Sequence, residues 1–380
     1  TLIFTLNDRR YYSQGIESKL TWDTTLSSAG IVVDSGIRLH KDNVKRHHRA
    51  SYYDMRDGVM ELNSSPSDVI TKNDDTATAL AAFANVNAEI ERLHLTFGLR
   101  VEHIEGETIN LLPELLSNQE TTNSDTVVLP GAGAFYQLTD RQGILFGVNK
   151  GYVPNSPGQE TSIDPEESWN YEFGWRYNSE WLESELVGFY NDYSNLKGAC
   201  TFSSGCIQTS DQTLDQEFNG GEVDVYGVEA SANGNIELTH RIALPIKIAY
   251  TYSQSEFQNS FESSFSQWGD VEAGDELPYL PEHQVSVEVG LQSGNWQVSL
   301  LLKYITEMSE AAGRNTELAG EFTEELLQLD LSSWYQLNDK IKLYGKIDNI
   351  TNEEIIVSRR PFGARPNKPQ QAIVGFKYSF

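Results

Sequence analysis

The sequence predicts an all-β protein, a transmembrane antiparallel β-barrel, from three observations. Long segments alternate apolar and polar residues, the connections between them alternate between short and long, and the last segment ends in a phenylalanine. Alternation with period two gives a strand one apolar face and one wet face. Strands of about ten residues, with short turns at one end and long loops at the other, are typical of membrane barrels.

The C-terminal strand carries this pattern most clearly. Ala372, Val374, Phe376, Tyr378 and Phe380 share one face, and polar residues occupy most of the other. A closing strand with aromatic residues near its end is what a bacterial outer-membrane barrel uses last. Phe380 is therefore a candidate barrel signal. The alternative is an edge strand of a soluble β-sandwich.

About fifteen strands are expected from the periodicity. Aromatic residues gather toward the strand ends, which suits the two interfacial girdles of a membrane barrel. The expected spans are 9–24, 28–45, 75–89, 91–108, 123–139, 142–153, 166–178, 180–196, 221–236, 239–257, 281–293, 295–309, 323–337, 340–351 and 369–380.

The connections support the same fold. Short ones contain tight-turn residues such as Gly, Asn, Asp and Ser. The long ones cover roughly 46–74, 109–122, 154–165, 197–220, 258–280, 310–322 and 352–368. Single-chain bacterial barrels have an even number of strands, so an odd count indicates an incomplete barrel. The first residues resemble the middle of a strand, and we expect a mature chain that is truncated at its front.

Composition narrows the class of protein. The 380 residues contain no linker or composition break, so 1–380 is expected to be one domain. There is no run of about eighteen apolar residues, and hence no expected transmembrane helix. The net charge of −27 argues against nucleic-acid binding, because the phosphate backbone would be repelled. Without a G-x-S-x-G, H-E-x-x-H or phosphate-loop motif, the chain is not expected to be an enzyme.

Two cysteines, Cys200 and Cys206, flank a turn-forming Ser-Ser-Gly. Such a close pair predicts a small disulfide loop formed in an oxidising compartment. A metal site is the less favoured alternative, because no second Cys/His pair follows at ligand spacing.

Five arginines in the expected long loops are candidate ligand contacts: Arg46, Arg49, Arg314, Arg359 and Arg360. Arginine binds carboxylates in a bidentate manner, through charge-assisted hydrogen bonds. In so acidic a chain, any site for an anionic ligand must be locally cationic. Solvated loop bases or lipid headgroup contacts are the alternative interpretations, favoured for the first two.

Four aromatic residues, Trp169, Tyr171, Trp175 and Tyr177, recur with period two on one face. They could form a stripe that stacks against a ligand. A lipid-facing stripe is the favoured interpretation, because barrels require aromatic girdles.

Several segments resemble the C-terminal part of TonB-dependent outer-membrane receptors, and among these the ferric-dicitrate branch. The resemblance covers essentially the whole chain, and its motifs are specific only when taken together. The segments are Val148-Asn-Lys-Gly-Tyr-Val-Pro-Asn-Ser-Pro, Pro165-Glu-Glu-Ser-Trp-Asn-Tyr-Glu-Phe-Gly-Trp-Arg-Tyr, Val223-Asp-Val-Tyr-Gly-Val-Glu-Ala, Leu343-Tyr-Gly-Lys-Ile-Asp-Asn-Ile-Thr-Asn and Arg360-Pro-Phe-Gly-Ala-Arg-Pro-Asn-Lys-Pro.

The resemblance implies a barrel of about 22 strands filled by an N-terminal plug. The present chain would supply the last fifteen or so strands, with the plug absent. It further implies energy-coupled uptake of a ferric chelate, ferric citrate or a siderophore, across a Gram-negative outer membrane. Iron would be carried only within the ligand, and no cofactor is expected. The implied partners are the TonB complex, through the missing N-terminal region, and outer-membrane lipid or lipopolysaccharide.

Two alternatives stay open at this stage. One is a receptor of the same fold for another large nutrient, such as a cobalamin-like ligand or an oligosaccharide. The other is a passive porin or adhesin barrel without energy coupling.

Overall fold

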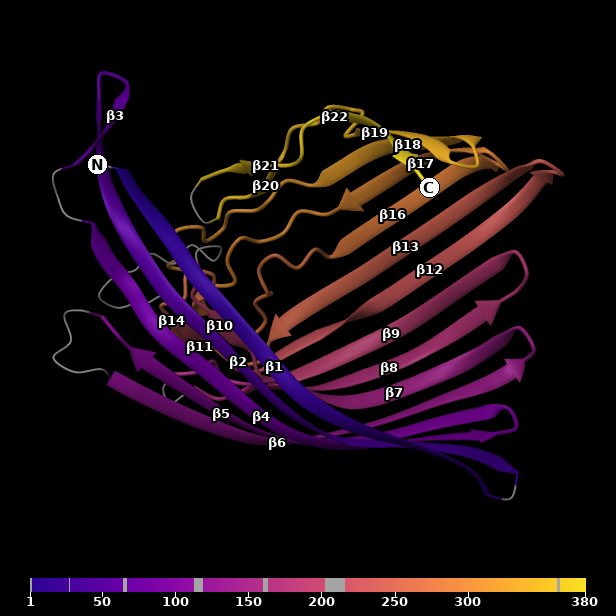
Figure 1. Ribbon diagram of the computed structural model, residues 1–380, viewed down its shortest axis with the longest axis horizontal. Coiled ribbons are helices and arrows are strands. Elements are labelled where there is room, and N and C mark those ends of the chain that lie inside the picture. The colour runs from indigo at the N-terminus through magenta and orange to yellow at the C-terminus, as the bar shows by residue number, and fades with distance from the viewer. Residues whose placement is uncertain are drawn as a thin grey trace. The chain divides into compact units, whose positions relative to one another are not determined.

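A computed structural model describes residues 2–26, 28–63, 67–112, 119–159, 163–201, 216–360 and 363–380. Every regular element in these ranges is a β-strand (Figure 1). No helix in them has the length and hydropathy needed to cross a membrane. The all-β prediction is confirmed.

The long strands and one short strand form a single 16-stranded sheet. Its strands are β1 (Leu2–Leu26), β2 (Ala29–Arg56), β3 (Val59–Leu62), β4 (Asp68–Ile90), β5 (Leu93–Asn110), β6 (Gln119–Thr139), β7 (Gln142–Val153), β8 (Glu166–Asn178), β9 (Leu182–Asn195), β12 (Val223–Thr239), β13 (Ile242–Phe257), β16 (His283–Ser293), β17 (Trp296–Ile305), β18 (Leu326–Asn338), β19 (Ile341–Asp348) and β22 (Gln371–Tyr378).

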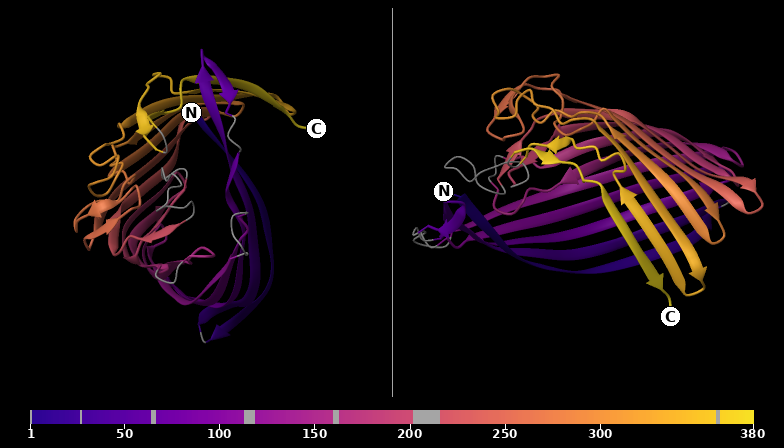
Figure 2. Two further views of the ribbon diagram at one scale, coloured as in Figure 1. Left: turned by 90° about the vertical axis from the view of Figure 1, so that its left-hand side faces the viewer. Right: turned by 90° about the horizontal axis from the view of Figure 1, so that it is seen from above.

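The order of hydrogen-bonded neighbours follows the chain. It runs β1-β2-β4-β5-β6-β7-β8-β9-β12-β13-β16-β17-β18-β19-β22, with β3 paired to β2 off this path. The expected count of about fifteen long strands, paired in chain order, is therefore confirmed. Consecutive long strands run side by side in the views of Figure 2.

Three small hairpins lie in the long connections. They are β10 (Lys197–Ala199) with β11 (Glu217–Asn219), β14 (Phe261–Ser263) with β15 (Gly269–Val271), and β20 (Ile356–Ser358) with β21 (Arg365–Pro366). The opposite strand ends are joined by short turns, such as Asp140–Arg141 between β6 and β7. The predicted alternation of short and long connections is thus present in the described ranges.

The first two strands are longer than predicted. They were expected over 9–24 and 28–45, but residues 46–56, placed in a loop, continue β2. β1 and β2 pair without a register shift from Leu26↔Ala29 to Leu2↔Tyr53. The turn comes only at Asp57-Gly58, where both φ angles are positive, 51° and 81°. Asp-Gly favours this conformation, which joins β2 to β3 as a tight hairpin.

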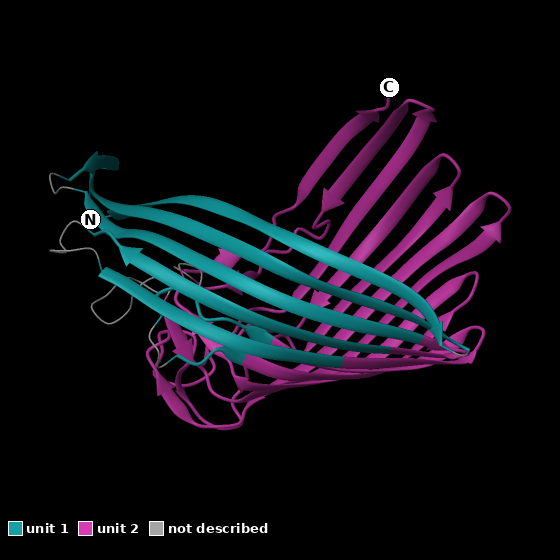
Figure 3. Cartoon of the chain, turned by 60° about the horizontal axis from the view of Figure 1, so that its bottom comes forward, with its two compact units in different colours: residues 1–88, 96–131, 152–166 teal, residues 89–95, 132–151, 167–380 magenta. Residues whose placement is uncertain are grey.

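Contacts divide the chain into two compact units (Figure 3). The first comprises residues 1–88, 96–131 and 152–166, and the second comprises 89–95, 132–151 and 167–380. The first unit holds β1 to β3 and most of β4, β5 and β6. The second holds most of β7, the strands from β8 onward, and the small hairpins.

The apolar faces of the long strands are exposed in both units. In β1, Ile16, Leu20 and Trp22 are 72%, 67% and 62% exposed. In β8, Trp169, Tyr171, Phe173 and Trp175 face the same way and are all exposed. An apolar surface of this extent marks a contact with a membrane or a partner. This placement supports the lipid-facing interpretation of the aromatic stripe.

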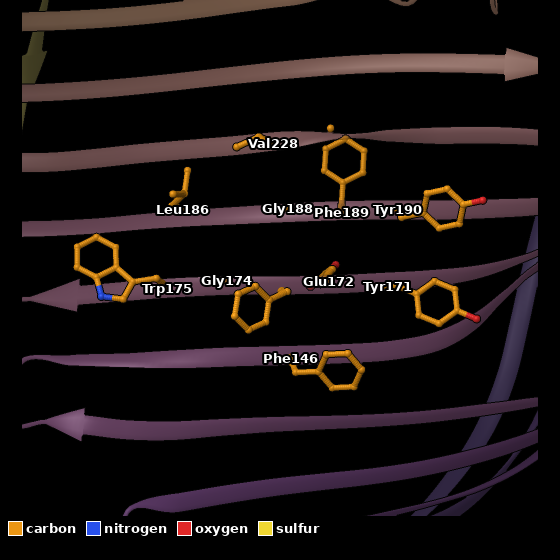
Figure 4. A pocket seen from close by; sticks show the side chains of 12 residues that line it. Phe146, Tyr171, Glu172, Gly174, Trp175, Leu186, Gly188, Phe189, Tyr190 and Val228 are labelled. Carbon is orange, nitrogen blue, oxygen red and sulfur yellow. The ribbon is translucent and has the colours of Figure 1, made fainter.

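A hollow interrupts this apolar face in the second unit. Gly188 of β9 lies between Phe173 and Val228 in the strand register. The middle position of this row therefore has no side chain. The result is a cavity of about 470 Å³ bordered by aromatic and aliphatic side chains (Figure 4). A row of Tyr171, Tyr190 and Tyr226, with ring centroids 6.2 and 6.5 Å apart, lies beside it.

A buried apolar core of the second unit lies where the long connections meet the ends of β12 and β13. It consists of Cys200, Val223, Phe257, Phe265, Trp268 and Val271. Trp268 meets Phe265 edge-to-face at 4.9 Å and Phe261 at 5.7 Å between ring centroids. We call this group the loop core. It joins the segments that carry β10–β11 and β14–β15 to the ends of β12 and β13.

The exposed apolar face predicts a specific sensitivity to charge. Phe173→Arg should destabilise the intact protein in lipid vesicles by about 2–4 kcal/mol, the cost of arginine on the lipid face of a barrel. Glu172→Arg, one residue away on the opposite face, should change the free energy of unfolding by less than ~1 kcal/mol. Denaturant titration measures both. Equal losses for the two variants would contradict the assignment of the faces.

Candidate functional site

Arg46 and Arg49 lie within strand β2, not at the start of a loop. An odd spacing of three residues places them on opposite faces of the strand. Arg46 is on the face of His48 and Ala50, which are both buried. Arg49 is on the exposed face that carries Ile37 and Leu39 farther down the strand. The structure therefore does not bring these two predicted contacts together, because β2 continues past the point where a loop was expected.

A polar network surrounds Arg46 on the wet face of the first unit. Its Nε lies 3.4 Å from Oδ2 of Asp75, and the Oδ1 of the same carboxylate accepts a 2.9 Å hydrogen bond from the Thr108 hydroxyl. In the register, Arg9 of β1 is directly opposite Arg46. Arg9 donates to His48 Nε2 at 3.2 Å. Two arginines opposite each other repel, so this part of the face is favourable for an anion.

The same face carries cations that were not singled out from the sequence. Besides Arg9 they include Arg38, whose guanidinium lies 3.3 Å from His40 Nδ1, and Lys19, which pairs with Asp34 at 3.2 Å. These cations could have been found from the sequence by separating the even from the odd positions of each strand. Even positions of β2 from Asp34 to His48 are largely polar, and each pairs with an odd position of β1.

Arg359 and Arg360 take part in a buried ion-pair network in the second unit. Glu310 has no exposed surface, and its carboxylate accepts from Arg359 Nη1 at 3.2 Å and from the Arg359 backbone N–H at 2.9 Å. Arg360 is 6% exposed. Its guanidinium donates to the carbonyl of Glu310 at 3.2 Å and to that of Ser266 at 2.7 Å. The two predicted contacts thus fasten three long connections to one another.

Tyr279 completes this network. Its hydroxyl donates to the Glu310 carboxylate at 2.5 Å, and its φ of 60° places it in the left-handed region. Burial, together with the hydrogen bond to Glu310, raises the pKa of Tyr279 to about 12. The phenol therefore stays protonated, and able to donate, across the physiological pH range.

Arg314 forms a more exposed contact. It pairs with Glu272, and both side chains are about two-thirds exposed at 68% and 66%. Its backbone exchanges hydrogen bonds of 2.8 and 3.0 Å with Asp270. The backbone bridge, more than the ion pair, holds these connections, because exposed ion pairs contribute little.

The remaining predicted positions are placed only in part. Cys200 is fully buried in the loop core. Cys206 lies outside the described residues, so the disulfide stays a prediction. Phe380 is fully exposed and meets Tyr378 edge-to-face at 5.2 Å. Among the described residues, no three His, Cys, Asp or Glu side chains converge to hold a metal ion.

Comparison with known proteins gives one family and many related folds. The family described as "TonB dependent receptor-like, beta-barrel" matches residues 2–350. The ferric citrate transporter FecA, in its unliganded form, is 19% identical with a TM-score of 0.76, over 99% of this chain and 55% of that one. The ferric-catecholate import receptor Fiu from E. coli, in its closed form, is 16% identical with a TM-score of 0.73, over 98% and 55%.

The copper transporter OprC is similar to the same degree. It is 17% identical with a TM-score of 0.72, over 100% of this chain and 57% of that one. The chain therefore spans little more than half the length of these solved structures. At such identities the likeness is one of fold.

Glu310 should be the residue on which the loop network depends. Removing one partner of a buried ion pair typically costs about 3–5 kcal/mol, because the other charge stays buried. Glu310→Ala should therefore speed backbone hydrogen exchange in residues 306–325 and 349–360 by roughly 100- to 1,000-fold. Glu317→Ala, an exposed glutamate of the same connection, is the matched control. Unchanged protection in Glu310→Ala would refute the role.

The raised pKa of Tyr279 predicts an alkaline loosening of the loops. The folded protein holds this proton up to about pH 12, whereas a free tyrosine loses it near pH 10. Stability from this group is therefore present below pH 10 and lost between pH 10 and 12. Cleavage of the loops by an alkali-tolerant protease should rise from pH 9 to 11.5 more in the parent than in Tyr279→Phe. The exposed Tyr11→Phe should behave as the parent, and identical slopes in all three would count against the prediction.

Proposed function

Because the chain belongs to the TonB-dependent receptor β-barrel family, we propose that it forms the barrel part of a receptor for energy-coupled uptake of a ferric chelate. The observation that carries this proposal is the family match over residues 2–350. The family is one of receptors, and no catalytic role is proposed.

The exposed apolar face supports a membrane location. Lipid would cover side chains such as Phe173 and Trp22, which water would otherwise contact. We propose the outer membrane of a Gram-negative bacterium, with the long connections outside the cell and the short turns in the periplasm. The terminal Phe380 would then end a strand at the periplasmic side.

The rest of the receptor is proposed from the length comparison. The chain spans about 55% of the solved FecA structure. We propose that the full protein also contains the first barrel strands and an N-terminal plug that contacts the TonB complex. Transport would require those parts, so the present chain alone would bind a ligand at most.

The wet face of the first unit supports an anionic ligand. Arg9, Arg38 and Arg46 lie on this face in a protein whose net charge is −27. A multivalent carboxylate chelate of iron would be repelled by the acidic surface and attracted to these guanidinium groups. The iron is cargo within the ligand. Of the five arginines predicted from sequence, Arg46 alone lies on the same face as Arg9 and Arg38.

The ligand itself stays a proposal, with ferric citrate as the first choice and another siderophore as the second. The likeness to a copper transporter is about as strong as that to the ferric receptors. A copper species therefore belongs among the ligands tested. A cobalamin-like ligand or an oligosaccharide is the alternative within the same fold.

The proposal predicts that arginines of the wet face control ligand affinity. In the full-length receptor, Arg46→Ala and Arg9→Ala should each weaken equilibrium binding of ferric citrate by about tenfold or more, since a charged hydrogen bond contributes roughly 1.5–3 kcal/mol. Uptake of labelled ferric citrate should fall in parallel. Arg49→Ala, on the opposite face of the same strand, is the matched control.

The outcomes separate the site from the ligand. If the double variant Arg9→Ala/Arg46→Ala binds ferric citrate as tightly as the parent, the site is wrong. If the parent binds a copper species or a siderophore but not ferric citrate, the ligand is wrong and the receptor assignment survives.

A further inference from the structure

The wet face of the second unit is acidic in its first strands and basic in its last. In β8, β9 and β12 this face carries Glu172, Glu183, Glu185, Glu229 and Glu237, with Arg176 as the cation. In β17, β18, β19 and β22, the orange to yellow strands of Figure 1, it carries Lys303, Lys342, Lys346 and Lys377, with Asp330 and Asp348 as the carboxylates. A basic surface is the reverse of the overall composition, because the net charge is −27.

The lysines nearest the long connections have carboxylate partners within the fold. Lys346 lies 2.5 Å from Asp348, and Lys303 lies 3.8 Å from Asp330. Lys368, in the connection before β22, also pairs with Asp348. Both aspartates are buried, with side chains 5% and 1% exposed. These ion pairs therefore have a structural explanation, and no ligand is needed to account for them.

Lys342 and Lys377 are placed differently. They lie directly opposite each other in the pairing of β19 with β22. Opposite residues on neighbouring strands have Cβ atoms about 4.5–5.5 Å apart, so the two like charges repel. In the ranges that the structure describes, neither ammonium group pairs with a carboxylate. Asp339 belongs to the short turn, and Phe380 lies on the opposite face. An anion between the two ammonium groups would relieve the repulsion.

The side chains around this pair suit a carboxylate. Lys342 Nζ lies 3.8 Å from the centroid of the Trp334 ring, a cation–π contact that fixes the ammonium group on the wet face. The Trp334 Nε1 donates to Gln297 at 3.1 Å, which holds the indole in turn. Tyr344 lies across Gly375, where any side chain would collide with its ring, and it is 46% exposed. Its hydroxyl adds a donor to the same face.

The pair lies at the short-turn end of the strands. Lys342 is the second residue of β19 (Ile341–Asp348), and Lys377 is the last but one of β22 (Gln371–Tyr378). The site with Arg9 and Arg46 belongs to the first unit, so the two groups of cations are separate features of the fold.

We propose that Lys342 and Lys377, with Trp334 and Tyr344, form a second anion site, which takes a carboxylate group of the ligand on its way along the wet face toward the short turns. This inference rests on the proposed function, because it names a step in the passage of that ligand. The step is one of binding alone, in which the carboxylate replaces water between the two ammonium groups.

Uptake by the full-length receptor is the first test. Lys342→Gln/Lys377→Gln should lower the maximal rate of labelled ferric citrate uptake by about tenfold, because two charged hydrogen-bond donors are lost. The half-saturating concentration should stay within about twofold, since the first site is intact. Lys342→Arg/Lys377→Arg keeps both charges and should restore the rate. Arg241→Gln/Lys340→Gln removes the same charge from two short turns and should take up ligand as the parent does.

Thermal melting separates a binding role from a structural one. Removal of two like charges that face each other relieves repulsion, so Lys342→Gln/Lys377→Gln should melt no lower than the parent. A lower melting temperature with a matching loss of receptor from the membrane would overturn the proposal, because the slow uptake would then report misfolding. A normal maximal rate in the same variant would also overturn it.

Citrate without iron is the probe for direct binding. In the Arg9→Ala/Arg46→Ala background at low salt, calorimetric titration should show citrate binding that weakens about tenfold when Lys342→Gln/Lys377→Gln is added. Added salt should shrink this difference, because exposed charges are screened. If no citrate binds in that background, a carboxylate of the receptor itself occupies the lysines, and the inference is wrong. If the parent takes up no ferric citrate but the lysines bind citrate, the proposed function fails and the anion site stands.

Discussion

The backbone hydrogen-bond ladder between consecutive long strands is the constraint on which the other features depend. A strand inside a bilayer has no water to bond its N–H and C=O groups, so each must be paired with a neighbouring strand. Pairing fixes the register, and the register fixes which residues share a face. The exposed apolar face of β1 and the wet face with Arg9 and Arg46 both follow from the uninterrupted pairing of β1 with β2. A slip by one residue would exchange the two faces.

The long connections are organised by a different interaction. The long connections are not held by a continuous ladder of backbone hydrogen bonds. They are held together by the buried side chain of Glu310. The carboxylate is desolvated, which is costly, but it accepts from Arg359 and Tyr279. Such a group restricts the arrangement of its neighbours more than it stabilises them, because a displaced partner leaves a buried charge behind. The apolar loop core, with Trp268 at its centre, supplies the hydrophobic contribution.

The strands could be predicted from sequence because their signal is local. Alternation over ten residues, with turn residues at one end, gave their number, order and approximate positions. The upper half of β2 was missed because its alternation is between polar residues, so periodicity in hydropathy ends near Val44 while pairing continues to Tyr53. The roles of Arg359 and Arg360 were not accessible for another reason. Their partner Glu310 is about fifty residues away, and only the folded loops bring them together.

The contact of Arg360 with two other connections bears on how the surface formed by the long connections can be re-engineered. The Arg360 guanidinium donates hydrogen bonds to the carbonyls of Ser266 and Glu310. The three segments that carry these residues therefore have to be transferred together. Transplanting any one of them into a related barrel would leave the others without their anchor. The tip of the β2–β3 hairpin is the opposite case, since the pairs of Asp54–Arg56 with Val59–Glu61 and the Asp57-Gly58 turn lie beyond Tyr53, the last β2 residue paired with β1. That hairpin can be exchanged, shortened or fitted with an epitope tag by itself, and it is the natural first site for loop grafting.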